Sequence, residues 1–102
     1  MITTATKITL EELCTAPALS RSLVVEMVEY EVVRPLAGNS DRDWVFDSSA
    51  AHWAQRALRL KSDLELDWIA VAMLVDLLRE REALARENEQ LRQRLARFLA
   101  GE

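Results

Sequence analysis

The chain has 102 residues, half of them apolar, and its 17 acidic and 13 basic side chains give a net charge of −4. This length accommodates one domain, or one small domain with an extension. One cysteine (Cys14), one histidine (His52) and two glycines exclude an intrachain disulfide and a glycine-rich phosphate loop, and no ligand set has zinc-site spacing, so we expect no enzyme, no metal and no cofactor.

Two short helices are predicted at the start of the chain. Thr9 and Glu12 form a Thr-x-x-Glu capping box that opens the first helix, which runs through Cys14, after a lead-in at residues 1–8. Ser20 is the expected cap of the second helix, which runs to about Tyr30. Two short helices with a brief connection make a helix-turn-helix pattern. The expected inner side of the second helix consists of Leu23, Met27 and Tyr30.

A small β-hairpin, or wing, is expected next. Val32 and Val33 precede Pro35, a turn-rich segment follows at residues 38–41, and the β-forming residues 44–46 come after it. Pro35 confines its strand to an edge. The sequence therefore predicts that the segment at residues 32–33 pairs with the segment at residues 44–46.

A third helix and a long fourth helix complete the prediction. The third runs from Ser49 to about Lys61, preceded by Asp47 and Ser48, and the fourth runs from its cap Asp67 to about Ala100. We divide the chain into a head at residues 1–66 and a long helix at residues 67–102. The expected inner face of the third helix includes Ala50, Trp53, Ala54, Ala57 and Leu58.

The long helix carries an apolar stripe that repeats about every 3.5 residues, as in a coiled coil. With Leu74 at position a, the following a positions are Arg81, Asn88 and Leu95. A single Asn among such positions, here Asn88, typically sets the register of the pairing. We predict a homodimer, and both parallel and antiparallel pairing remain open. The alternative to self-association is that the helix folds back on its own head. The expected dimer residues are Leu77, Leu84, Asn88, Leu91, Leu95 and Phe98.

Charge is unevenly distributed along the chain. Residues 1–50 have a balance of −4, whereas residues 79–102 have a balance of +1. An acidic head repels a phosphate backbone and favours a basic protein partner, although these acids could also simply solvate the head. We expect Trp44 and Phe46 to be core residues. The candidate partner-binding residues are Glu26, Glu29, Tyr30, Glu31, Asp41 and Asp43.

No export signal or membrane span is apparent. The start lacks a basic segment followed by an apolar one, and the nearly apolar run at residues 68–78 is short and contains Asp76. These features predict a soluble, cytoplasmic protein.

Several motifs in their chain order resemble those of the chaperone-modulator proteins of bacteria, the CbpM family. They are VVRP at residues 32–35, WVFD at 44–47, QRALRL at 55–60, LELDW at 64–68 and LRQRLARFLA at 91–100. The resemblance implies a mainly α fold with a MerR-like winged helix-turn-helix head and a C-terminal coiled-coil-type helix.

The resemblance also implies a function and a partner. Family members bind the J-domain of the DnaJ-like co-chaperone CbpA and inhibit its co-chaperone and DNA-binding activities. The recognition motif of MerR-type proteins, an Arg followed by a Tyr pair, is replaced by SLVVEMVE at residues 22–29, so we expect no direct nucleic-acid binding. The alternative is a MerR-type DNA-binding transcription regulator.

Overall fold

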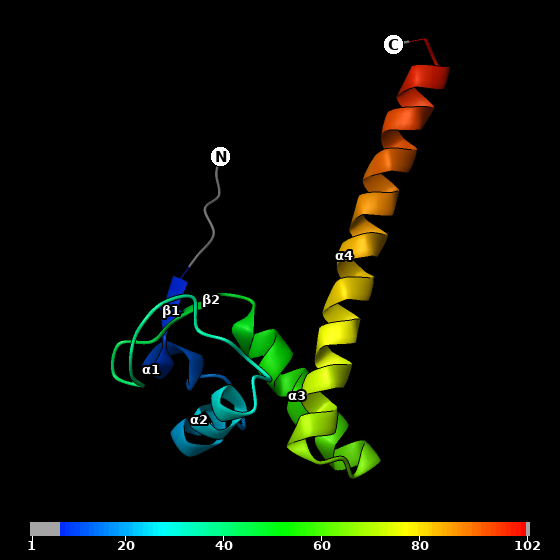
Figure 1. The fold of residues 1–102 in the computed structure, drawn as a ribbon. Helices are drawn as coiled ribbons and strands as arrows, with labels where there is room; N and C mark the ends of the chain where they lie inside the picture. The colour runs from blue at the N-terminus through cyan, green and yellow to red at the C-terminus, as the bar shows by residue number, and fades with distance from the viewer. Residues whose placement is uncertain (1–6, 102) are drawn as a thin grey trace.

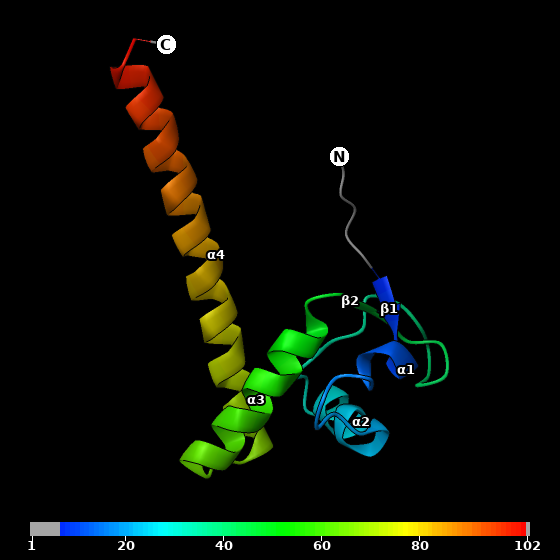
Figure 2. The same cartoon turned by 180° about the vertical axis from the view of Figure 1, so that it is seen from behind.

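The computed structural model describes residues 7–101, which form a compact head and a long projecting helix (Figure 1). α3 crosses the base of α4 and packs against it, and α2 lies to one side of them (Figures 1 and 2). The predicted class is confirmed: mainly helical, with a small antiparallel two-stranded sheet and a long C-terminal helix. The elements in chain order are β1 (Lys7–Thr9), α1 (Leu10–Leu13), α2 (Arg21–Glu29), β2 (Val45–Asp47), α3 (Ala50–Leu64) and α4 (Trp68–Leu99).

The caps predicted for the first two helices are confirmed. The Thr9 N–H donates to Glu12 Oε1 at 2.8 Å, and the Glu12 N–H donates to Thr9 Oγ1 at 3.1 Å, which completes the capping box of α1. At α2, the Leu23 N–H donates to Ser20 Oγ at 3.2 Å. These local hydrogen bonds satisfy N–H groups that have no partner within the helix.

The predicted inner side of α2 is right at Met27 and Leu23, which packs partly buried against the core, and wrong at Tyr30. Val24 and Met27 are fully buried, whereas Tyr30 is 44% exposed. The chain leaves α2 through Glu31, which adopts a left-handed backbone with φ 61°, and the Val32 N–H then donates to the Met27 carbonyl at 2.8 Å. This turn leaves Tyr30 at the surface and carries the following residues into the core.

The strand pairing differs from the predicted hairpin. β2 pairs antiparallel with β1, with Ile8 opposite Phe46, and not with Val32 and Val33. Those two valines are both buried, whereas successive residues of a strand point to opposite faces. The segment after them contributes one isolated bridge, Ala37 to Val45. Lys7 and Ile8, expected in the lead-in, are therefore strand residues, and the rest of that segment lies outside the described residues.

α3 and the first turns of α4 pack together. Ala50, Trp53, Ala54 and Ala57 of α3 are buried as predicted, although the helix extends to Leu64. The Asp67 carboxylate caps α4 by accepting the Ala70 N–H at 2.9 Å. Beyond the core contact, the Arg56 guanidinium of α3 pairs with the Glu82 carboxylate of α4. The buried residues of α4 are Trp68, Val71 and Val75.

Gly38 is required by the loop before β2, and its replacement tests this turn. Its φ is +111°, and a Cβ there would lie 2.5 Å from the Asp43 carbonyl oxygen. We expect Gly38→Ala to lower the free energy of unfolding by about 2 kcal/mol or more, measured by urea denaturation. Gly101→Ala is the matched control because it also has a positive φ (+83°) but nothing within 4 Å. Equal small losses for both variants would contradict this account.

Candidate partner-binding surfaces

The C-terminal half of α2 presents acids to solvent. Glu26 and Glu29 lie one turn apart, and both are exposed. Within residues 7–101, neither carboxylate takes part in a side-chain hydrogen bond or an ion pair. Together with the adjacent Glu31, they define what we call the α2 acidic surface.

Glu31 takes part in an ion pair at the surface. Its carboxylate lies 3.5 Å from Arg34 Nε, and Arg34 also donates two hydrogen bonds to the Asp76 carboxylate of α4, at 3.3 and 3.2 Å. The hydrogen bond to Asp76 is the largest cause of the raised pKa of Arg34. The charge of Glu31 is therefore partly compensated, while its position is tied to α4.

Asp41 and Asp43, the other predicted acids, have structural partners. Asp41 pairs with Arg21 of α2 at 3.1 Å, and Arg21 also pairs with Glu11 at 3.3 Å. Asp43 Oδ1 accepts the N–H groups of Asn39 and Ser40 at 3.0 and 2.9 Å. These bonds, chiefly the one from Ser40, lower the pKa of Asp43. Arg21 thus compensates the acids beside the N-terminal end of α2, and Asp43 organises the loop.

The aromatic candidates differ in how far they are exposed to solvent. Tyr30 lies directly after α2, beside the acidic surface, and is 44% exposed. Trp44 is half-buried and packs edge-to-face on the fully buried Phe46, with ring centroids 6.0 Å apart. The expected core role is confirmed for Phe46, whereas Trp44 is only partly buried against the core. Tyr30 remains available as an anchor for a partner.

The apolar stripe of α4 is uncovered. Leu77 is 62% exposed, and every residue from Ala83 to Gly101 is exposed. The alternative in which α4 folds back on its own head is therefore wrong. The exposed members of the predicted seam are Leu77, Leu84, Leu91, Leu95 and Phe98, together with Asn88.

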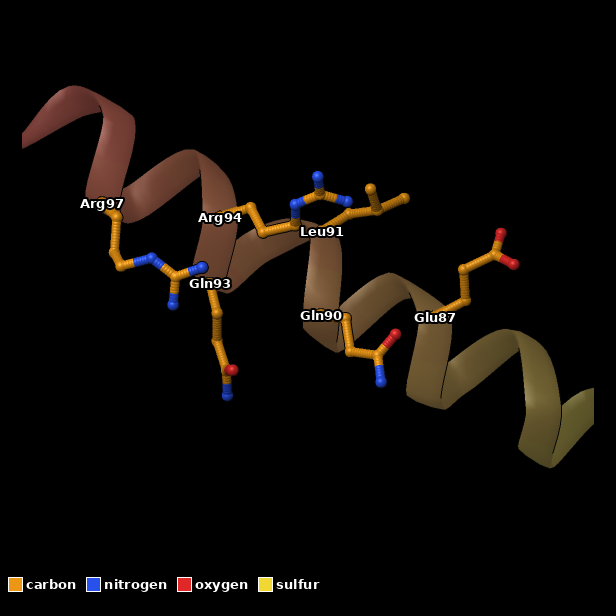
Figure 3. Close-up of a pocket in the computed structure, with 6 residues that line it drawn as sticks. All are labelled: Glu87, Gln90, Leu91, Gln93, Arg94 and Arg97. Atoms are coloured by element: carbon orange, nitrogen blue, oxygen red, sulfur yellow. The ribbon is translucent and has the colours of Figure 1, made fainter. Parts of the chain in front are cut away.

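A hollow of about 510 Å³ on α4 is not a ligand pocket. Its walls are Glu87, Gln90, Leu91, Gln93, Arg94 and Arg97, all from this one helix. Their side chains project toward different sides of the ribbon (Figure 3). With a single helix as its wall, the hollow cannot enclose a small molecule.

Few side chains among the described residues are suited to catalysis or metal binding. The thiol of Cys14 has a pKa raised by burial, which disfavours the reactive thiolate. Residues 7–101 contain no cluster of three or more His, Cys, Asp or Glu side chains suited to a metal ion. None of the helices in this range has the length and apolar character needed to cross a membrane.

The structure also shows functional candidates that the sequence pattern missed. Ile69 and Met73, to which the heptad pattern assigns no role, are 63% and 64% exposed at the base of α4. Leu74, placed on the coiled-coil a row, is instead half-buried. The heptad pattern does not predict the exposure of these three residues, because their exposure depends on where α3 packs.

Comparison with known proteins gives consistent matches. Residues 8–93 match the model of the MerR HTH family of regulatory proteins. The chain is 42% identical over 86 residues to the chaperone modulatory protein CbpM of Pseudomonas putida, covering 84% of each chain. It is 39% identical over 99 residues to that of Citrobacter koseri, covering 97% of each. For Salmonella paratyphi B the identity is 39% over 92 residues, covering 90% of each.

The lowered pKa of Asp43 predicts a pH dependence of stability. A carboxylate with a depressed pKa in the folded state stabilises it above the unfolded pKa, near 3.9, and this contribution is lost as pH falls through the folded pKa. We expect Asp43→Asn to lose less stability than the parent chain between about pH 5 and about pH 2. Urea midpoints across this range measure the loss, with Asp63→Asn, an exposed acid outside the loop, as control. Equal losses in all three proteins would contradict the role of Asp43.

Proposed function

Because this chain belongs to the CbpM family of chaperone modulatory proteins, we propose that it binds the J-domain of the DnaJ-like co-chaperone CbpA. Binding inhibits the co-chaperone and DNA-binding activities of CbpA. The chain is a non-enzymatic inhibitor that binds its partner stoichiometrically. It acts in the cytoplasm. Relatives that carry the name chaperone modulatory protein over nearly the whole chain length support this role.

The observation that carries the proposal is the α2 acidic surface. A J-domain presents a basic helical face to the chaperone that it recruits, and Glu26 and Glu29 are exposed acids without ion-pair partners in the described chain. Complementary charges steer association and fix the orientation of the complex. Tyr30, at the edge of this surface, supplies an apolar anchor.

The mechanism is competition for one face of the J-domain. While the α2 acidic surface occupies the basic helix, neither the chaperone nor a phosphate backbone can reach it. Direct DNA binding by this chain, the MerR-type alternative, is opposed by the same charges. Arg21 is the only cation of α2, and it is already paired with Glu11 and Asp41.

We also propose that the two parts of the chain have separate roles. Residues 1–66 form the partner-binding head, and residues 67–102 form the dimerisation helix. An exposed leucine stripe along a helix that leaves the head supports a homodimer.

Charge reversal on α2 tests the binding surface. We expect the double variant Glu26→Lys, Glu29→Lys to weaken J-domain binding by about tenfold or more, with a larger effect at low salt. Isothermal titration with the isolated J-domain at two salt concentrations measures it. The matched control is Asp63→Lys with Glu65→Lys, which changes the net charge equally at an exposed site away from α2. Unchanged affinity of the α2 variant would refute the electrostatic mechanism.

A second experiment tests the dimer. We expect Leu84→Glu to dissociate the homodimer, because it places a charge in the middle of the apolar seam. Sedimentation equilibrium gives the mass. Asn88→Leu should keep or strengthen association while relaxing the choice of register. If Leu84→Glu has the same mass as the parent chain, the seam is not the interface.

A further inference from the structure

The exposed apolar stripe of α4 begins beside the head, not beyond it. Ile69, Met73 and Leu77 are 63%, 64% and 62% exposed, although Trp68, Val71 and Val75 in the same turns are buried under the head. The base of α4 is therefore apolar on two sides, and the head covers only one of them.

The spacing joins these residues to the seam in one stripe. From Ile69 to Phe98, its members follow one another at intervals of three or four residues. At about 100° per residue, they fall on one side of the helix, opposite the side that holds Val71, Val75 and Glu82. Because this spacing follows the natural helix period, the stripe passes from Leu77 to Met73, and not to the half-buried Leu74. The stripe comprises Ile69, Met73, Leu77, Leu84, Leu91, Leu95 and Phe98, with polar positions at Glu80 and Asn88.

We propose that a second copy of this chain covers the stripe along its whole length, so that Ile69 and Met73 are interface residues. The proposal rests on the self-association proposed above and extends it to the base of the head. It lengthens the contact from about 32 Å, between Leu77 and Phe98, to about 44 Å at the usual rise of an α-helix.

The pattern of apolar and polar positions favours this longer contact. The C-terminal part holds one continuous apolar block, Leu91, Leu95 and Phe98, and an isolated Leu84 between two polar positions. Ile69, Met73 and Leu77 form a second block of similar length at the other end. With Ile69 and Met73 included, two apolar blocks give a coiled contact the length of about four heptads. A seam that begins at Leu77 has only one apolar block and spans about three heptads.

Charge identifies the occupant as another copy of the chain. Acids and arginines alternate within and beside the stripe, as at Glu80 with Arg81 and Glu87 with Arg92, and residues 79–102 have a net charge of only +1. A second copy offers both signs at matching intervals. A uniformly basic partner, which suits the α2 acidic surface, would meet as many arginines as acids here.

The test compares glutamate substitutions along α4 by sedimentation equilibrium. We expect Ile69→Glu and Met73→Glu each to raise the dimer dissociation constant at least tenfold, as Leu84→Glu does. Ala96→Glu is the control, because this exposed residue lies on a different side of the same helix. Circular dichroism and thermal melting of each variant verify that the head remains folded.

Three outcomes would overturn the extended interface. If Leu84→Glu dissociates the dimer while Met73→Glu and Ile69→Glu do not, the contact is confined to the C-terminal half. If Leu84→Glu also has no effect, the self-association on which the extension rests is wrong. If Met73→Glu leaves the dimer intact but weakens J-domain binding in the titration above, this face belongs to the co-chaperone. J-domain binding itself is tested separately through Glu26 and Glu29.

Discussion

The packing of α3 against one side of α4 determines what the rest of the molecule can do. Small side chains at Ala50, Ala54 and Ala57 let α3 lie close within the core, and Trp53 fills the space toward α4. The Trp53 ring is covered by the guanidinium groups of Arg56 and Arg79, at 5.1 and 5.0 Å from its centroid. Once this side of α4 is used, the opposite side has no neighbour among residues 7–101, and its leucines are exposed.

Hydrogen bonds and ion pairs within the fold determine which carboxylates of the head remain without a partner. The head is acidic overall, but most of its carboxylates serve the fold. Glu12 caps α1, Asp43 holds a loop, and Asp47 accepts the Ser49 N–H at 2.9 Å before α3. Such bonds fix a carboxylate at a set position and favour its charged form. Glu26 and Glu29, like Asp63 and Glu65 at the end of α3, have no cation that compensates them in the described residues, so part of the net acidity of the head is expressed at α2.

Local signals could be predicted from the sequence, whereas contacts between distant residues could not. Caps at Thr9, Ser20 and Asp67 depend on side chains within three residues of the bond that they make, so a short motif contains the information. The pairing of β1 with β2 joins segments far apart in the chain, and both strands are too short to show an alternating pattern. Likewise, acid counts cannot reveal that Arg21 reaches Asp41, because that ion pair exists only after the loop folds beside α2.

The two proposed surfaces are physically connected through Arg34. Its guanidinium pairs with Glu31 of the α2 acidic surface and with Asp76 of α4, which lies one turn beyond Met73 on the edge of the apolar stripe. A second copy seated at Met73 would remove water from the neighbourhood of Asp76 and strengthen its attraction to Arg34. Arg34 would then be held more firmly in the position that fixes Glu31. Because coupling between two binding events is reciprocal, a basic partner that competes for Glu31 would in turn alter the Asp76 side of the dimer contact.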